Sequence, residues 1–304
     1  MASLQMRALE IYLYLKKRFG DQSGVLDVAR ERADVESMAG MFKPFGPIQT
    51  EPVTANGVPA EWIQAPDVRP DRAILFLHGG SFNSGSIVSH RTLAGNVALA
   101  TGARVLLIDY RLAPEHPFPA GLEDSIAAYE WLLANGYGPQ QVVVAGDSAG
   151  GTLTLALLLQ QRDHVRPLPR AAVCLSPAAD LTFSSPSWEF NAKKDLMLDI
   201  RKERTAVEIY LRGTDVRAPL ASPLYADLHG LPPLLLQVGS HEVLLSDVQN
   251  LAEKARAAGV DVTLEVWPGM QHEWQFAAGM LPEGKKAIQR VGEFVEAAFA
   301  GSRS

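Results

Sequence analysis

The chain of 304 residues has little cysteine and no long apolar run. Its one cysteine, Cys174, excludes an intramolecular disulfide and a thiolate metal cluster, and its apolar neighbours indicate a buried strand residue. No apolar run approaches the roughly 18 residues that span a bilayer, so no membrane span is expected. A recognisable signal peptide is also absent, and we expect a cytoplasmic protein.

Basic residues are also fewer than acidic residues. The 28 lysines and arginines are outnumbered by 34 aspartates and glutamates, which gives a formal net charge of −6. This excess of acidic residues does not provide the basic surface that binding to a phosphate backbone requires, so nucleic acid is not expected as a partner. Apolar residues make up 47% of the chain, a share typical of a globular domain, not of a disordered chain.

Most of the chain alternates short apolar segments with longer segments of helical periodicity. This alternation predicts an α/β fold with a mostly parallel sheet and helices on both faces. The dipeptide Asn56-Gly57 predicts a hairpin turn between the first two strands. The expected strands are residues 48–55, 58–65, 73–77, 104–108, 141–145, 171–176, 234–238 and 262–266, and the expected helices are 90–100, 122–135, 149–162, 246–258 and 284–300.

Two parts of the chain depart from this alternation. Apolar residues at helical spacing predict helices within residues 1–47, which we expect to pack on their own domain and not to anchor a membrane. The sixth and seventh strands are separated by nearly 60 residues, too many for a simple crossover. We interpret residues 185–213 as an insertion that forms a cap with those helices, and residues 48–184 and 214–304 as the α/β core.

The sequence GDSAGG at residues 146–151 lies between an apolar strand and an apolar helix. This is the G-x-S-x-G motif in the context that places a nucleophile, here Ser148, on a strained turn. The flanking glycines let strand and helix approach closely, and the helix N-terminus supplies free N–H groups. The motif also occurs by chance, but its context favours catalysis. Asp147 is expected to be structural.

A second glycine-rich segment, HGGS at residues 78–81, follows the third expected strand. We expect the backbone N–H groups of Gly79, Gly80 and Ala149 to form an oxyanion hole. A phosphate-binding loop is the alternative, but neither Gly-Lys-Ser/Thr nor an immediate helix follows. We expect His78 to brace the loop.

A serine hydroxyl needs an adjacent base, and His272 is the only one of the seven histidines that directly follows the last expected strand. The acid that orients it should follow the preceding strand, where Glu242 and Asp247 compete. We favour Glu242, because Asp247 is expected inside the next helix, facing away or capping it. The order Ser148, Glu242, His272 is that of the α/β hydrolases and differs from those of chymotrypsin and subtilisin.

The combination of HGG at 78–80, GDSAGG at 146–151 and DYRLAPEHPFPA at 109–120 resembles the hormone-sensitive lipase family, the bacterial family IV esterases. The resemblance runs from about residue 70 to the C-terminus, and the N-terminal helices are similar to the family's cap. It implies an α/β-hydrolase fold with about eight strands and a helical cap, and a carboxylesterase without cofactor or metal. It also implies a homodimer formed through the edge of the last strand.

Two positions depart from the family's pattern. Ser81 replaces the third glycine of the usual HGGG, and we expect its side chain to narrow the alcohol or acyl space. Glu242 replaces the more common aspartate and is longer by one methylene, so the geometry must adjust while activity remains. Within residues 109–120 we expect Arg111 and Glu115 to form a buried ion pair that supports the site.

The residues and the resemblance together imply a carboxylesterase that hydrolyses short-to-medium acyl esters of small molecules through an acyl-enzyme on Ser148, the range of acyl chains being what the resemblance implies. Two alternatives remain: an amidase or arylformamidase with the same triad, and a non-catalytic receptor for a small molecule. The receptor is disfavoured because family relatives of that kind lose the histidine that is present here as His272. The candidate residues that line a pocket between cap and sheet are Ser81, Phe82, Asn83 and Trp188.

Overall fold

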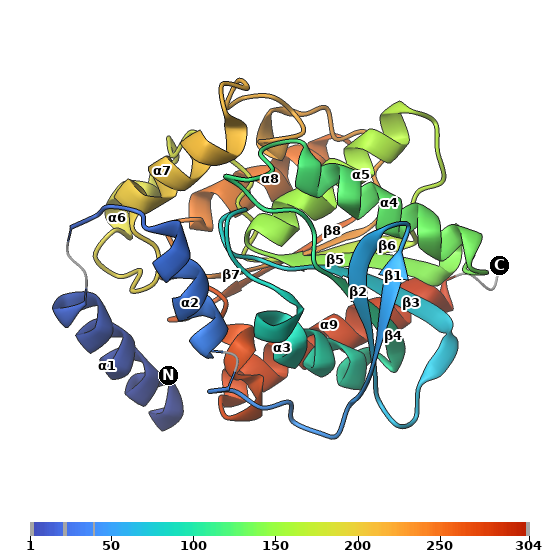
Figure 1. Ribbon diagram of the computed structural model, residues 1–304, viewed down its shortest axis with the longest axis horizontal. Helices are drawn as coiled ribbons and strands as arrows, with labels where there is room; N and C mark the ends of the chain where they lie inside the picture. The colour runs from blue at the N-terminus through green and yellow to red at the C-terminus, as the bar shows by residue number, and fades with distance from the viewer. Residues whose placement is uncertain (1–2, 21–22, 39, 302–304) are drawn as a thin grey trace.

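The protein folds around one eight-stranded sheet with the strand order β1-β2-β4-β3-β5-β6-β7-β8 (Figure 1). The computed structural model describes residues 3–20, 23–38 and 40–301. The first two strands pair antiparallel, β2 also pairs antiparallel with β4, and every other neighbour is parallel. The strands are β1 (Gln49–Ala55), β2 (Val58–Gln64), β3 (Arg69–Leu77), β4 (Ala103–Ile108), β5 (Val142–Asp147), β6 (Ala171–Leu175), β7 (Leu234–Gly239) and β8 (Val262–Trp267).

The predicted eight strands and their mostly parallel arrangement are confirmed. The predicted hairpin between β1 and β2 is also present, and both of its turn residues, Asn56 and Gly57, have positive φ angles of 49° and 89°. Such angles are what a two-residue hairpin turn requires, and Asn-Gly tolerates them better than other pairs. β8 lies at the opposite edge of the sheet and pairs only with β7 among the described strands.

Helices cover both faces of the sheet, because alternate side chains of its central strands point into two separate cores. Leu75 and Val144 pack beneath α4, α5 and α8, while Ile74 and Val143 pack against α3 and α9. Cys174 lies in the first of these cores, as predicted. The helices are α1 (Leu4–Phe19), α2 (Val28–Met38), α3 (Ile87–Thr101), α4 (Ala120–Ala134), α5 (Ala149–Asp163), α6 (Ser187–Phe190), α7 (Ile200–Leu211), α8 (Leu245–Ala257) and α9 (Pro282–Ala300).

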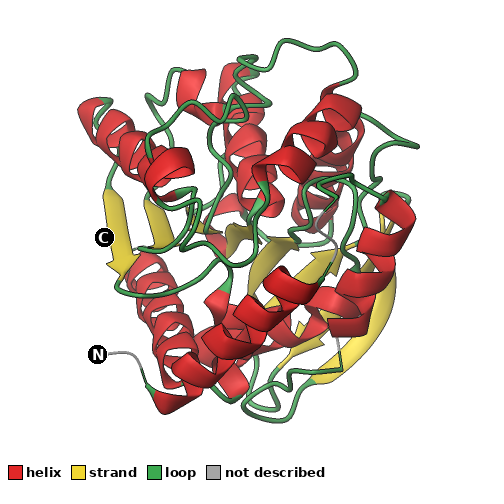
Figure 2. Cartoon of the chain, turned by 90° about the vertical axis from the view of Figure 1, so that its left-hand side faces the viewer, coloured by secondary structure: helices red, strands yellow, loops and turns green. Residues whose placement is uncertain are grey.

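The helices α1, α2, α6 and α7 gather at one end of the molecule, in front of the carboxyl ends of the parallel strands (Figures 1 and 2). α6 and α7 both lie within the insertion predicted at residues 185–213, and the four-residue helix α6 is too short for a periodic pattern to reveal it. The N-terminal helices therefore lie beside the insertion, which is the arrangement that the predicted cap requires. The exact division between core and cap stays a prediction. None of the helices described here is both long enough and apolar enough to cross a bilayer.

The expected ion pair between Arg111 and Glu115 is wrong. Arg111 faces the first turn of α4, where Glu123 and Asp124 accept hydrogen bonds from its guanidinium. Glu115 turns outward and instead pairs with Arg32 of α2 at 2.7 Å. Charged side chains close in sequence therefore pair with different elements, because the loop that carries them contacts both α4 and α2.

Arg32 joins α2 to the loops at the carboxyl ends of the parallel strands. Its guanidinium donates to the backbone oxygens of Asn83 at 2.8 Å and Ala113 at 3.0 Å, in addition to the carboxylate of Glu115. No neutral side chain could replace these three interactions together.

We expect Arg32→Ala to lower the free energy of unfolding by about 1–2 kcal/mol, because partly exposed charge-assisted hydrogen bonds have this modest net value. Urea unfolding followed by circular dichroism measures the change. Arg7→Ala, at an exposed position on α1, is the matched control and should leave the midpoint unchanged. Equal midpoints for Arg32→Ala and the parent would contradict this role of Arg32.

Candidate active site

Ser148 occupies the sharp turn between β5 and α5, with φ of 48° and ψ of −117°. A side chain rarely adopts this backbone conformation, so the turn is strained. The turn also brings backbone segments into contact: a Cβ on Gly150 would lie 1.9 Å from the oxygen of Leu77, and one on Gly146 would lie 2.3 Å from the oxygen of Gly150. Glycine is therefore required at both positions, as the motif predicted.

The three side chains that the sequence analysis selected meet beside this turn. The Oγ of Ser148 lies 3.1 Å from Nε2 of His272, and Nδ1 of His272 lies 2.8 Å from Oε2 of Glu242. They come from the carboxyl ends of β5, β8 and β7 respectively, which parallel strands bring to one edge of the sheet. Their relative exposures are only 7%, 4% and 0% for Ser148, His272 and Glu242, so the hydrogen bonds form away from bulk water.

Glu242 is held in place by its second carboxylate oxygen. Oε1 accepts hydrogen bonds from the Ser176 hydroxyl at 2.7 Å and from the backbone N–H of Gly239. Burial raises the pKa of Glu242, and the hydrogen bonds from His272, Gly239 and Ser176 oppose that increase. These donors favour the ionised form, which is the form that can orient an imidazole.

Asp247, the competing carboxylate, has a different environment. It lies in α8 and accepts a hydrogen bond from the indole N–H of Trp188 at 3.0 Å. Its carboxyl group is buried inside the helix and faces away from His272, which is the first of the two expected alternatives; it does not cap the helix. A buried indole needs an acceptor, and Asp247 supplies it. Burial raises the pKa of Asp247 to about 7.

The segment at residues 78–81 passes close to Ser148, but its first glycine does not have a free N–H. The N–H of Gly79 donates to Oδ2 of Asp147 at 3.1 Å. This contact corrects the prediction that Gly79 donates to an oxyanion, because a buried carboxylate already takes that hydrogen bond. Among the described residues, none accepts a hydrogen bond from the N–H groups of Gly80, Ser81 or Ala149.

His78 braces this segment, as predicted. Its Nδ1 lies 2.8 Å from the oxygen of Gly79, and its ring stacks on Tyr110 with centroids 4.2 Å apart. The hydroxyl of Tyr110 donates to the backbone oxygen of His78 at 2.7 Å. Burial lowers the pKa of His78 to about 3, so the ring is neutral and serves packing and hydrogen bonding.

Comparison with known proteins agrees with this geometry. A family model for the alpha/beta hydrolase fold matches residues 74–276. An acetyl-hydrolase of Streptomyces hygroscopicus is 46% identical over 89% of this chain and 89% of its own length, and an esterase of Acinetobacter venetianus is 36% identical over 86% and 87%. The crystal structure of an esterase from the bacterial hormone-sensitive lipase family superimposes with a TM-score of 0.93 at 46% identity, covering 98% of this chain and all of that one.

The chain belongs to the hormone-sensitive lipase family of α/β hydrolases. It is a carboxylic ester hydrolase. The resemblance stated from its motifs is therefore confirmed, and the receptor alternative is not supported.

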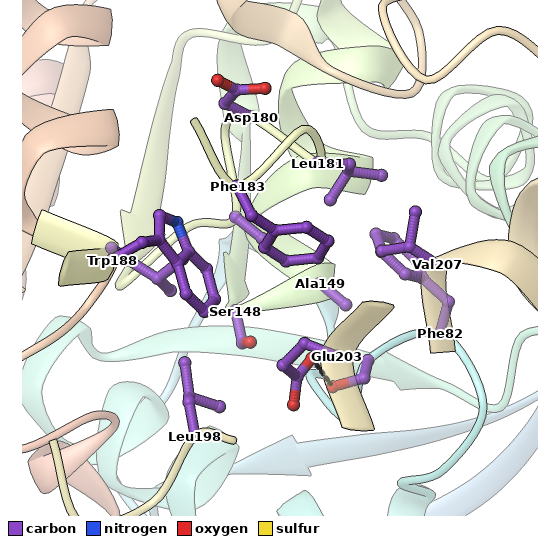
Figure 3. A pocket seen from close by; sticks show the side chains of 13 residues that line it. Phe82, Ser148, Ala149, Asp180, Leu181, Phe183, Trp188, Leu198, Glu203 and Val207 are labelled. Carbon is purple, nitrogen blue, oxygen red and sulfur yellow. Dashed lines mark hydrogen bonds between the residues drawn. The ribbon is translucent and has the colours of Figure 1, made fainter. Parts of the chain in front are cut away.

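Two cavities of this hydrolase meet at Ser148. The larger, of about 380 Å³, opens between α1, α2 and α7 and includes Asn83, Ser81 and His272 in its wall. The smaller, of about 20 Å³, also borders Ser148 and is lined mainly by apolar side chains, among them Phe82 and Trp188 (Figure 3). All four predicted lining residues thus border one cavity or both. No cluster of side chains suited to a metal ion occurs among the described residues.

Glu203 is a site residue that the sequence analysis missed. This residue of α7 is partly buried, borders both cavities, and accepts a hydrogen bond from the Ser81 hydroxyl at 2.8 Å (Figure 3). Burial raises its pKa to about 7. Ser81, where the family usually has glycine, therefore connects the loop near Ser148 to α7. A glutamate in an amphipathic helix ordinarily indicates a solvated face, so no sequence signal marked it.

The geometry distinguishes the two candidate acids. We expect Glu242→Gln to lower kcat by about 10²–10⁴-fold, because a neutral amide cannot stabilise an imidazolium. Asp247→Asn should change kcat by less than about threefold, since asparagine can still accept from Trp188. Steady-state hydrolysis of p-nitrophenyl butyrate measures both variants. A larger loss for Asp247→Asn than for Glu242→Gln would refute the choice of Glu242.

Proposed function

We propose that this chain is a carboxylesterase for short acyl esters in which Ser148 is the nucleophile, His272 the base and Glu242 the acid that orients it. The contacts of 3.1 Å and 2.8 Å that connect the three side chains are the main support. Ser148 attacks the ester carbonyl while His272 takes the hydroxyl proton. His272 then protonates the leaving alcohol, and water releases the acid from the acyl-enzyme.

The developing oxyanion is proposed to bind the N–H groups of Gly80, Ser81 and Ala149. These groups have no acceptor among the described residues, and Ala149 begins α5, where helix geometry leaves the N–H free. A donor that is already oriented stabilises the transition state by about 3 kcal/mol. Gly80 has a φ of 113°, and a Cβ there would lie 2.4 Å from the oxygen of Ser84, so glycine is needed for the loop to take this shape.

The two cavities are proposed to bind different parts of the ester. His272 must reach the leaving alcohol to protonate it, and His272 borders only the larger cavity. The alcohol therefore belongs in the larger cavity and the acyl chain in the smaller one. The smaller cavity, at about 20 Å³, has little more room than a water molecule needs, which favours the short end of the predicted acyl range. The name of the acetyl-hydrolase relative agrees with this preference.

Removal of the nucleophile tests the mechanism. We expect Ser148→Ala to lower kcat by about 10⁴-fold or more, because no other group replaces the hydroxyl. A serine-directed phosphonate should label the parent and not the variant, as mass spectrometry of the intact chain will show. An unchanged circular dichroism spectrum serves as the control for folding. Hydrolysis of p-nitrophenyl butyrate by the variant at the parent's rate would refute the assignment.

Acyl-chain length tests the assignment of the cavities. We expect kcat/KM for p-nitrophenyl acetate and butyrate to exceed that for the octanoate by about tenfold or more, because the longer chain does not fit the smaller cavity. Phe183→Ala, which enlarges that cavity, should raise kcat/KM for the octanoate. Phe190→Ala, at an exposed position, is the matched control. An optimum on the octanoate in the parent would contradict the proposal.

The same assay separates esterase from amidase. p-Nitroacetanilide carries the acyl group of p-nitrophenyl acetate on an amide, so only the leaving group differs. We expect the ester to be hydrolysed and the anilide to react at least about 10³-fold more slowly, since the anilide is the intrinsically less reactive compound. Comparable rates would favour the amidase alternative.

A further inference from the structure

Two carboxyl groups that the proposed mechanism does not use lie directly behind the site. Asp147 precedes the nucleophile in sequence and Glu273 follows the histidine, and both pack against the same point of the backbone. A Cβ on Gly79 would lie 2.5 Å from Oδ2 of Asp147 and 2.6 Å from Oε1 of Glu273. Asp147 is fully buried, and 15% of the Glu273 side chain is exposed. A side chain at residue 79 would therefore have to displace these two carboxyl groups.

The two carboxyl groups lie close together, since both reach the same point beside Gly79, and each one affects the pKa of the other. Two carboxylates repel each other and contain no hydrogen to share, so this proximity favours protonation of one member of the pair. No described group donates to Oδ1 of Asp147 or Oε1 of Glu273, which leaves the shared proton as the link between them.

The surroundings indicate which member holds the proton. Oδ2 of Asp147 accepts the N–H of Gly79 at 3.1 Å and lies 3.2 Å from Nε2 of His90. Burial lowers the pKa of His90 to about 4, so its ring is neutral and can donate one hydrogen bond to the carboxylate. Two donors favour the ionised form of Asp147, whereas Glu273 has no such support. Burial raises the pKa of Glu273 to about 8; the charge of His272 opposes this increase, and the nearby charge of Asp147 adds to it.

Glu273 also lies close to the base. Its Oε1 is 3.7 Å from Nε2 of His272, the atom that faces the Ser148 hydroxyl. Burial lowers the pKa of His272, and negative charge on Glu273 is the largest of the effects that raise it, ahead of the contact with Glu242. A charged Glu273 therefore favours a proton on the nitrogen that has to accept one from Ser148, and a neutral Glu273 removes that contribution.

We propose that Asp147 and Glu273 form an acid pair that shares one proton, and that Glu273 is a positioning residue for ester hydrolysis. While Glu273 is protonated, it places no negative charge beside Nε2 of His272. The shared proton also fixes the position of Asp147, which accepts the N–H of Gly79 and so holds the segment 78–81 against the turn that carries the nucleophile. The inference rests on the proposed roles of Ser148 and His272.

The pair makes activity depend on pH in one direction. As pH rises through about 8 the shared proton is lost, two negative charges face each other in one buried site, and activity falls. The observed pKa belongs to the whole cluster, not to one residue. The titratable groups that face Glu273 are Asp147 from β5, His272 after β8, His90 from α3 and Tyr110 after β4.

Glu273→Gln tests the proposal, because its amide can donate to Asp147 but cannot ionise. We expect kcat at pH 7 to stay within about threefold of the parent, and the alkaline fall of kcat/KM to move up by about one pH unit or more. Glu273→Ala removes the partner of Asp147 and should lower kcat at pH 7 by about tenfold or more. Glu296→Gln, a charge removal on the exposed face of α9, is the matched control.

The measurement is hydrolysis of p-nitrophenyl acetate between pH 6 and 10, corrected for spontaneous reaction. An alkaline fall at the same pH in Glu273→Gln and the parent overturns the acid pair, and so does a parent-like profile of Glu273→Ala. An inactive parent would instead refute the proposed function. Infrared difference spectra provide a readout without turnover: the band of a protonated carboxyl should disappear above about pH 8 in the parent and be missing in Glu273→Gln. Identical spectra overturn the proposal.

Discussion

The structure depends on a close backbone approach at the start of α5. Gly146 and Gly150 lack the Cβ atoms that would collide with neighbouring backbone, so β5 can turn directly into the helix behind β3. The turn forces Ser148 into a positive φ and directs its hydroxyl to the edge of the sheet where parallel strands end. Because β7 and β8 end at the same edge, Glu242 and His272 can reach it. The strain at one residue is stabilised by the packing of the whole sheet.

Buried carboxyl groups surround this turn, and the protein stabilises each in a different way. Glu242 receives hydrogen bonds from a hydroxyl, a backbone N–H and the imidazole. Asp147 is paired with Glu273 and receives the N–H of Gly79. Glu203 faces the cavities and accepts a hydroxyl hydrogen from Ser81. Burial alone penalises every one of these charges, so the number of donors at each carboxyl decides which group is ionised.

Helices from two distant parts of the sequence contact the loops around Ser148. α2 reaches these loops through Arg32, and α7 reaches the segment 78–81 through Glu203. Glu203 also borders both cavities, so the side chain that connects α7 to this segment forms part of the wall of each. Ser81, which stands where the family usually has glycine, supplies the hydroxyl for this contact.

Local patterns in the sequence determined the strand and helix alternation, the turn at Ser148 and the order of the three selected residues, because periodicity and glycine placement act over a few residues. Only the tertiary structure decided which partner each charge meets. Arg111 pairs with α4 and not with Glu115, the N–H of Gly79 meets Asp147, and Glu203 turns inward. Such contacts join residues up to 122 positions apart, and no local pattern records which distant segments the packing brings together.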